Sequence, residues 1–543
     1  MKRKSNLLII PLLLVSLVSC GKDSSTKENE SRTPFSLLKK EDNKVTFIGK
    51  DGIPFLMKSA VLRTDLFINA DHYEVSNLDE YFALAKETGL STLEIPFMWK
   101  EIETDYDQYN YEDLENYLSF AKKYDLKINL LWYGSFTDGE SHTNNFPSYI
   151  YEDKSTYPLI QYCYPSSVFG DCVIMDWSNT NLLNREYKAL KTAMDYVYEW
   201  NLANENYDPI LMVQLGAGLD RLDRWRINQY EIKVNGEIMS SDTAWSLAST
   251  YASKMGNAVK DSKYKALTRV EFCEQQAVTN YVRDIYELSS VDIVNTSYLH
   301  TVAQTKTGIK NFDDEFGEEI PIINTENWSN DDNHRIALAT YAFGGSGFAS
   351  YHLSSPLYYP LENNQGVLYR RRNDSATTLE ERFLDINSRA SKLKQVNSLL
   401  DKGYVAIAKA KKNSFGLFGF DNLLSKGETS KQYMNNGIMF EYTANDENKL
   451  GYCIYLNNYL YVISNVDASF KLVNAVAQIA STGKFNSSSM WEKESDIEIN
   501  KEQTFNLNAN ELYRIRISNI DELPSYDELS KQGYKTINDA IRG

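Results

Sequence analysis

Short apolar runs alternate with amphipathic helical stretches eight times between about residues 44 and 353, and this alternation constrains the fold most. The clearest helical stretch covers residues 78–88, where apolar side chains recur at Leu78, Tyr81, Phe82 and Ala85 before Gly89. Alternating β and α units are typical of a parallel sheet, and eight of them predict a closed (β/α)8 TIM barrel of the α/β class. Strands are expected from residue 55 and at 92–97, 127–132, 210–215, 266–272, 291–298, 320–324 and 347–352, with further helices at 114–124, 183–200, 244–259 and 334–343.

The pattern changes after the eighth unit. Short alternating runs are separated by turns rich in Asn, Asp and Gly, and Asn457-Asn458 joins two runs at hairpin spacing, which predicts a C-terminal β-sandwich. The runs cover residues 404–408, 414–420, 438–442, 451–456, 459–464 and 512–517. We therefore place the barrel domain at 44–398, the sandwich at 399–520 and a terminal helix and tail at 521–543.

The first 20 residues have the organisation of an export signal. Three basic residues precede an apolar run at 7–18, which is too short to span a bilayer as a helix. The run ends in LVSC (17–20), which resembles a bacterial lipobox and implies cleavage before Cys20 and acylation of that cysteine. The alternative is an ordinary signal peptide with a chance cysteine. The following GKDSS resembles the export signal of Bacteroidetes surface lipoproteins, so we expect a signal peptide at 1–19, a flexible tether at 20–43, and a lipid-anchored protein on the outer face of the outer membrane.

Charge and cysteine content exclude some classes of partner. Lysine and arginine number 57 against 74 aspartates and glutamates, and the net charge of −17 argues against nucleic acid and anionic membrane surfaces. No Cys/His spacing suggests a metal site, so we expect neither metal nor cofactor. Cys163 and Cys172 lie nine residues apart in an exported chain, where a local disulfide is expected, while Cys273 and Cys453 lie in apolar runs typical of buried thiols.

Five segments at the expected strand ends resemble clan A glycoside hydrolases, in particular families 35 and 42. The segment FMWKEIE (97–103) resembles their W-x-x-h-E-P motif, and NFPSYI (145–150) resembles a later turn. PIINTENW (321–328) resembles the segment that carries the catalytic nucleophile, and YAFGGSGFASY (341–351) the glycine-rich last strand. PILMVQLGAG (209–218) resembles a fourth strand that in the family runs close to P-I-I-M-V-Q-V-E-N-E.

This resemblance implies retaining hydrolysis by two carboxyl groups, of which the chain keeps one. Glu326 takes the place of the nucleophile, with a structural ion pair as the alternative, whereas Gly218 stands where the acid/base glutamate belongs and Ala217 where an asparagine belongs. Glycine cannot transfer a proton, and general acid assistance is worth roughly 10²–10⁴-fold. Asp220 is the best candidate for a relocated acid, with an ion pair to Arg221 or Arg224 as the alternative; other carboxyl groups near strand ends are Glu101, Glu103, Glu271 and Glu274.

Polar and aromatic residues at the expected strand ends form a candidate sugar-binding set. Each of them could instead serve only in packing at the barrel mouth, but as a set around one cleft they favour a carbohydrate. The set consists of Trp99, Glu101, Trp132, Tyr133, Tyr298, His300, Trp328, Tyr351 and His352.

Three functions follow from these features. The first is a surface lipoprotein that binds β-linked oligo- or polysaccharides with impaired or absent hydrolysis and feeds a glycan importer. The second is an active retaining β-glycosidase, β-galactosidase-like, with Glu326 as nucleophile and a relocated acid. The third is a structural scaffold with a dead cleft, which would leave Glu326 and the aromatic set without a purpose.

Overall fold

The computed structural model describes residues 31–39, 44–65, 74–135, 145–163, 172–216, 233–234, 237–272, 280–297, 299–316, 319–327, 332–353, 369–371, 383–385, 388–411, 414–420, 426–486, 490–524 and 534–536.

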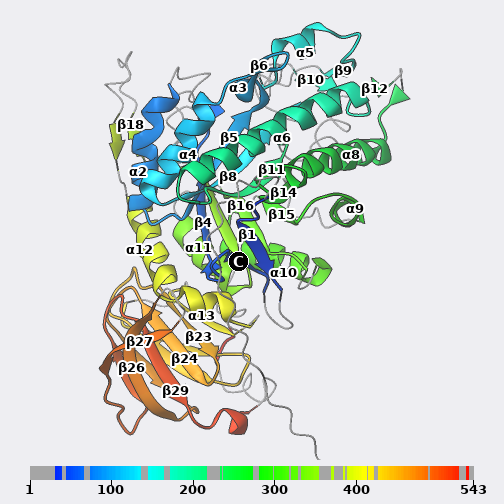
Figure 1. Cartoon of the computed structure of the whole chain (residues 1–543). Coiled ribbons are helices and arrows are strands. Elements are labelled where there is room, and N and C mark those ends of the chain that lie inside the picture. Colours follow the sequence, from blue (N-terminus) through cyan, green and yellow to red (C-terminus); the bar gives the residue numbers. More distant parts are fainter. Residues whose placement is uncertain are drawn as a thin grey trace, which may run out of the picture.

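Eight parallel strands close into a barrel in the order in which they follow one another along the chain, so the TIM barrel prediction is confirmed (Figure 1). The strands are β4 (Met57–Val61), β5 (Thr92–Met98), β8 (Lys127–Tyr133), β11 (Ile210–Leu215), β14 (Leu267–Phe272), β15 (Ile293–Ser297), β16 (Ile323–Asn327) and β17 (Gly347–Tyr351). Short two-stranded ribbons extend from the body: β6 (Glu103–Asp105) with β7 (Gln108–Tyr109), β9 (Leu159–Cys163) with β10 (Cys172–Met175), β12 (Lys233–Val234) with β13 (Glu237–Ile238), and β18 (Tyr369–Arg371) with β19 (Phe383–Asp385).

Helices surround the barrel, and side-chain caps fix where the two longest begin. The Asn179 side chain accepts a hydrogen bond from the Leu182 amide at 2.9 Å, and Ser240 accepts one from Thr243 at 3.2 Å, satisfying amides that have no partner within the helix. The helices are η1 (Val75–Leu78), α2 (Asp79–Glu87), α3 (Trp99–Ile102), α4 (Glu112–Tyr124), α5 (Ser148–Glu152), α6 (Thr180–Ala203), α8 (Ser241–Lys260), α9 (Asn280–Leu288), α10 (Val302–Phe316) and α11 (Asn333–Ala342).

A small antiparallel sheet closes the amino end of the barrel. It consists of β1 (Phe35–Leu38), β2 (Thr46–Gly49) and β3 (Pro54–Phe55). Phe35 and Phe47 pack against an apolar layer of barrel residues that includes Met212 and Ile323. The opening of the barrel must therefore lie at the carboxyl ends of the strands, where TIM barrels carry their sites.

A charged cluster fills the middle of the barrel above this apolar layer. Arg269 Nη1 lies 2.6 Å from Glu94 Oε1, and Arg269 Nη2 donates to Gln214 Oε1. Asn129 Nδ2 donates to the same Glu94 oxygen at 3.2 Å. All four side chains are buried, so the ion pair and its amide partners are shielded from water.

The C-terminal sandwich consists of two antiparallel sheets, which confirms the second part of the predicted fold class. A buried apolar layer that includes Phe440, Val462 and Ile515 separates the sheets. The six-stranded sheet has the order β20 (Phe415–Phe418), β23 (Gly451–Leu456), β24 (Tyr459–Ser464), β29 (Tyr513–Ile517), β26 (Ala477–Phe485), β27 (Trp491–Asp496), and the four-stranded sheet β21 (Thr429–Tyr433), β22 (Met439–Thr443), β25 (Ala468–Leu472), β28 (Thr504–Leu507).

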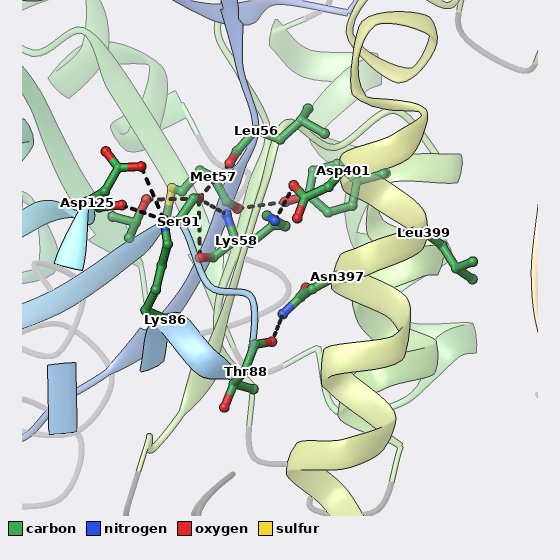
Figure 2. A network of polar contacts seen from close by, with 12 residues as sticks. Leu56, Met57, Lys58, Lys86, Thr88, Ser91, Asp125, Asn397, Leu399 and Asp401 are labelled. Atoms are coloured by element: carbon green, nitrogen blue, oxygen red, sulfur yellow. Dashed lines mark hydrogen bonds and ion pairs between the residues drawn. The ribbon is translucent and has the colours of Figure 1, made fainter. Parts of the chain in front are cut away.

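Helix α12 (Ser388–Lys402) joins the two domains, and Figure 2 shows its contacts with the barrel. Asn397 Nδ2 donates to the Thr88 carbonyl at 3.0 Å, and Asp401 pairs with Lys58 on the first barrel strand. On the sandwich side, the Tyr452 hydroxyl donates to the Leu399 carbonyl at 2.7 Å. The same helix therefore holds the barrel and the sandwich together.

Two of the expected strands were wrong in type or position. Residues 404–408 form helix α13 (Tyr404–Lys409), because a short apolar run rich in alanine packs as well in a helix as in a strand. The seventh barrel strand begins at Ile323 rather than at residue 320, since Pro321 has no amide hydrogen to donate to the ladder.

Several expectations concern residues that the structure describes in part or not at all. The backbone register of β9 and β10 places Cys163 directly opposite Cys172, and the disulfide between them stays a prediction. Cys453 is a buried free thiol, as expected, while Cys273 lies outside the described residues. The signal peptide, Cys20 and most of the tether also lie outside them, as does most of the expected C-terminal helix beyond η6 (Ile520–Glu522). Among the helices described, none is long and apolar enough to cross a membrane.

Candidate functional site

Glu326 lies at a β-bulge at the carboxyl end of β16. Asn324 stands opposite Phe348 and Asn327 opposite Ser350, so β16 contains one residue more than its partner between these two pairs. Glu326 has a left-handed φ of 47°, which costs a side-chain-bearing residue about 1–3 kcal/mol and persists only where the surroundings enforce it. The bulge turns a half-buried carboxylate to a direction that a regular strand would not give it.

A polar group lies at the carboxyl ends of neighbouring strands, and one member, Tyr133, is within the electrostatic reach of Glu326. Arg63, just after β4, donates to both oxygens of Asp65 at 2.8 and 2.6 Å and to the Tyr351 hydroxyl at 2.5 Å. Tyr351 packs in one apolar cluster with Tyr133 at the end of β8, and its ring contacts that of His352. The peptide bond between Tyr351 and His352 is cis.

Burial and neighbouring charges keep Tyr133, Arg63 and His352 each in one protonation state near neutral pH. Burial raises the pKa of the Tyr133 hydroxyl well above 10, and the charge of Glu326 raises it further although Arg63 lowers it, so Tyr133 stays a neutral donor. Burial alone would lower the pKa of Arg63, but the charge of Asp65 raises it well above its ordinary value. Burial and the charge of Arg63 lower the pKa of His352 well below 6.5, so its imidazole is neutral.

Glu271 is a second carboxyl group within the electrostatic reach of Glu326. It lies on β14, is 4% exposed, and accepts hydrogen bonds from the Thr325 hydroxyl and, at 3.5 Å, from Asn295 Nδ2. Burial and the negative charge of Glu326 raise its pKa to about 8, although the positive charge of Arg269 lowers it. Burial and the charge of Glu326 therefore favour the protonated form of Glu271 near neutral pH.

The end of β8, which places Tyr133, is held from behind by Glu186 on α6. This buried carboxylate accepts from Trp132 Nε1 at 2.9 Å, from the Ser135 amide at 3.2 Å and from the Tyr251 hydroxyl at 2.6 Å. A side chain at Gly134 would collide with it, because an added Cβ would lie 1.8 Å from Glu186 Oε1.

Two tryptophans of the predicted sugar-binding set are not at the mouth. Trp99 and Trp132 are fully buried in the core, and their indole nitrogens donate to Glu103 and Glu186 at 2.8 and 2.9 Å. Neither ring has a face free for a sugar, so the prediction of stacking is wrong for both. The side chain after an inward-facing strand residue points outward in a barrel, and strand-end position alone does not separate the two directions.

The remaining members of that set have different outcomes. Tyr133, Tyr351 and His352 lie together, and Tyr133 is within the electrostatic reach of Glu326. Arg63 and Asp65 were not anticipated, and their sequence signal is an LRTD segment (62–65) directly after the first apolar run. Glu101 is half-buried, and its carboxylate accepts a hydrogen bond from the Met98 amide at 2.8 Å, so it caps α3. Burial raises the pKa of Glu101 to about 8. His300 is half-buried, with a pKa lowered by burial. A sugar contact by Glu101 or His300 stays a prediction, and Ala217, Gly218, Asp220, Glu274, Tyr298 and Trp328 lie outside the described residues.

In the described part of the chain no three His, Cys, Asp or Glu side chains are arranged to hold a metal ion. The carboxyl groups of the mouth are instead paired with arginine, with hydroxyl groups or with amides. Such an arrangement can hold sugar hydroxyls, offer one carboxylate to an anomeric carbon, and keep one proton on a neighbouring carboxyl group.

No family model and no curated protein sequence matches the chain. Among solved structures, an exo-β-1,4-mannosidase from Opitutaceae bacterium strain TAV5 is 10% identical with a TM-score of 0.44, over 65% of this chain and 60% of its own. A family 1 β-glucosidase from Thermotoga maritima is 8% identical with a TM-score of 0.43, over 63% of this chain and 97% of its own. A GH30 endoxylanase from Clostridium papyrosolvens C71 is 10% identical with a TM-score of 0.43, over 86% of this chain and 97% of its own. The chain thus spans less than two thirds of the mannosidase, and at these identities the likeness concerns the fold alone.

Proposed function

We propose that the barrel mouth binds a β-linked oligo- or polysaccharide and hydrolyses it slowly or not at all. The observation that carries this proposal is the left-handed backbone of Glu326 at the end of β16. A strained glutamate at a strand end of this kind of barrel favours a functional carboxylate over a structural ion pair. Around it, the Tyr133 hydroxyl and the Arg63–Tyr351 pair supply the fixed hydrogen-bonding groups that sugar hydroxyls need.

The weakness of hydrolysis is argued from the chain after β11. The strand ends at Leu215, and the next three residues are Gly216, Ala217 and Gly218, none of which can donate a proton from a side chain. A sugar leaving group departs poorly without protonation, so a loss of roughly 10²–10⁴-fold is expected relative to an enzyme with the donor in place.

An activated aryl β-glycoside tests the role of Glu326, because its leaving group needs little protonation. Slow turnover is expected in the wild-type chain and should vanish in Glu326→Gln, while Glu287→Gln, which alters an exposed carboxyl group on α9, should behave as wild type. Titration calorimetry with β-linked oligosaccharides should detect binding in all three proteins. The proposal is refuted if both turnover and binding are absent across a broad glycan panel.

The second candidate function is an active retaining β-glycosidase with Glu271 as its proton donor. It is favoured by the raised pKa of about 8 and by the electrostatic coupling of Glu271 to Glu326. In this case a natural β-linked oligosaccharide should be cleaved efficiently, and Glu271→Gln should abolish that cleavage while sparing the aryl glycoside. Efficient cleavage that survives Glu271→Gln would leave a different group, such as Asp220, as the donor.

The location proposed for this function is the outer face of the outer membrane, with a lipid anchor at Cys20, beside a glycan importer. The support is the LVSC segment and the basic and apolar residues before it. Metabolic labelling with palmitate should mark the wild-type protein and not Cys20→Ala. Labelling that persists in the variant would rule out this cysteine as the anchor.

A further inference from the structure

The outer face of the six-stranded sheet carries a group of aromatic and basic side chains beside the region that contacts α13. The inner face packs on the second sheet, and α13 contacts the outer face at β23. Farther across the sheet, the outer face at β24, β29, β26 and β27 carries half-buried Tyr459, Phe485 and Trp491. The exposed Ile479, at 55%, extends the same face. Figure 1 places the sandwich on the opposite side of the barrel from α3 and α5, which follow the strand ends at the mouth.

Two arginines of β29 lie on this face among the aromatic rings. Strand register places Arg514 opposite Tyr461 and Arg516 opposite Tyr459. The Arg514 guanidinium lies 3.6 Å from the Tyr459 ring centre and 5.6 Å from that of Trp491. Trp491 is fixed in turn by Phe485 and Tyr461, with ring centres 5.5 and 6.0 Å away.

These arginines differ from the other basic residues of the sheet in their lack of acidic partners. Lys493 on the same edge pairs with Asp496 at 2.5 Å, and Lys484 approaches Glu492 at 3.8 Å. Within the described residues neither Arg514 nor Arg516 forms an ion pair, although Arg514 hydrogen-bonds the Tyr461 hydroxyl, and Arg514 Nε is buried without a partner.

We propose that Arg514 and Arg516, with Tyr459 and Trp491, form a second binding site that takes an acidic polysaccharide, through carboxylate or sulfate groups. A guanidinium close to aromatic rings and hydrogen-bonded to a tyrosine hydroxyl has a restricted range of positions, and its remaining N–H groups can match two oxygens of such an anion. The ring edges beside it offer apolar contact to the sugar that carries the anion. The choice of a glycan over another polyanion rests on the function proposed for the barrel.

The test is binding of the purified full chain to dextran sulfate, with unsulfated dextran as the matched neutral polymer and polygalacturonate as the carboxylate-bearing one. Wild type is expected to bind at least one acidic polymer, more weakly as salt rises, and not to bind dextran. The double variant Arg514→Gln/Arg516→Gln should bind that polymer at least about tenfold more weakly. Lys501→Gln, which removes one charge from an exposed turn elsewhere in the sandwich, should bind as wild type.

Arg516→Gln alone guards against misfolding, because its side chain is exposed, and a several-fold loss is expected from it. Unchanged binding in the double variant, equal binding of dextran, or equal competition by polyglutamate would each overturn the proposal. Turnover of the aryl glycoside should be the same in the double variant and in wild type. Failure of the barrel function would appear in that assay, whereas failure of the second site would appear only in polymer binding.

Discussion

Arg269→Met is expected to lower the free energy of unfolding by about 3–5 kcal/mol, because it leaves the Glu94 carboxylate buried in the barrel without its counter-charge. Arg269 and Glu94 are 0% and 1% exposed, and the side-chain oxygen of Gln214 would lose its hydrogen-bond donor as well. Glu94 then has no cation to offset the loss of its hydration. The midpoint of urea unfolding, followed by tryptophan fluorescence, measures the loss.

The buried position of the pair, and not the loss of an arginine as such, should cause this effect. Arg283→Met removes an arginine that is 25% exposed and pairs with Glu315 and Glu287, so a change below about 1 kcal/mol is expected. The double variant Glu94→Leu/Arg269→Met removes both charges and should recover most of the stability lost in Arg269→Met. A single variant as stable as wild type would contradict the argument.

Glu271→Gln is expected to change how stability depends on pH. The native Glu271 carboxyl group has a pKa of about 8, raised by burial and by Glu326, whereas in the unfolded chain it returns towards 4.5. Between these values the native state holds a proton that the unfolded state has released. The contribution of Glu271 to stability is therefore full below about pH 4.5, falls by up to roughly 1.4 kcal/mol per pH unit through the window, and is lost above pH 8.

Removal of this titration should flatten the stability curve between pH 5 and 8. Wild type should lose stability across that range, and Glu271→Gln should lose less, with part of the slope left because burial also raises the pKa of Glu101 to about 8. Glu287→Gln, on the exposed face of α9, should follow the wild-type curve. Parallel curves for wild type and Glu271→Gln would mean that Glu271 is ionised in the native protein at pH 7.

The barrel and the sandwich could be predicted from the sequence because local patterns determine them. Eight alternating β and α units commonly close into a barrel. The strands β23 and β24 end where expected because Asn457 and Asn458 accept the positive φ of a tight turn. The prediction failed where a short run fits either structure, as at Tyr404–Lys409.

The site was predicted only in part, because its chemistry depends on the direction in which each side chain points and on contacts between residues far apart in the chain. Glu326 could be found from its neighbours in sequence, but no local pattern reveals that β16 bulges there or that Arg63 reaches Tyr351 across the closure of the barrel. The raised pKa of Glu271 likewise comes from burial and from a charge 55 residues away in sequence. Trp99 and Trp132 were misplaced because strand ends carry side chains on both sides of the barrel wall.

The strand β1 fixes how the molecule would be presented if held by its leading residues. Arg32, just before it, hydrogen-bonds Asn206 and bonds with its backbone to Lys263 and Lys265, at the end of the barrel where β11 and β14 begin. The described chain begins beside these contacts, at the closed amino end of the barrel. An attachment through the residues before Ser31 would therefore leave Glu326 at the opposite end of the barrel, facing away from the attachment.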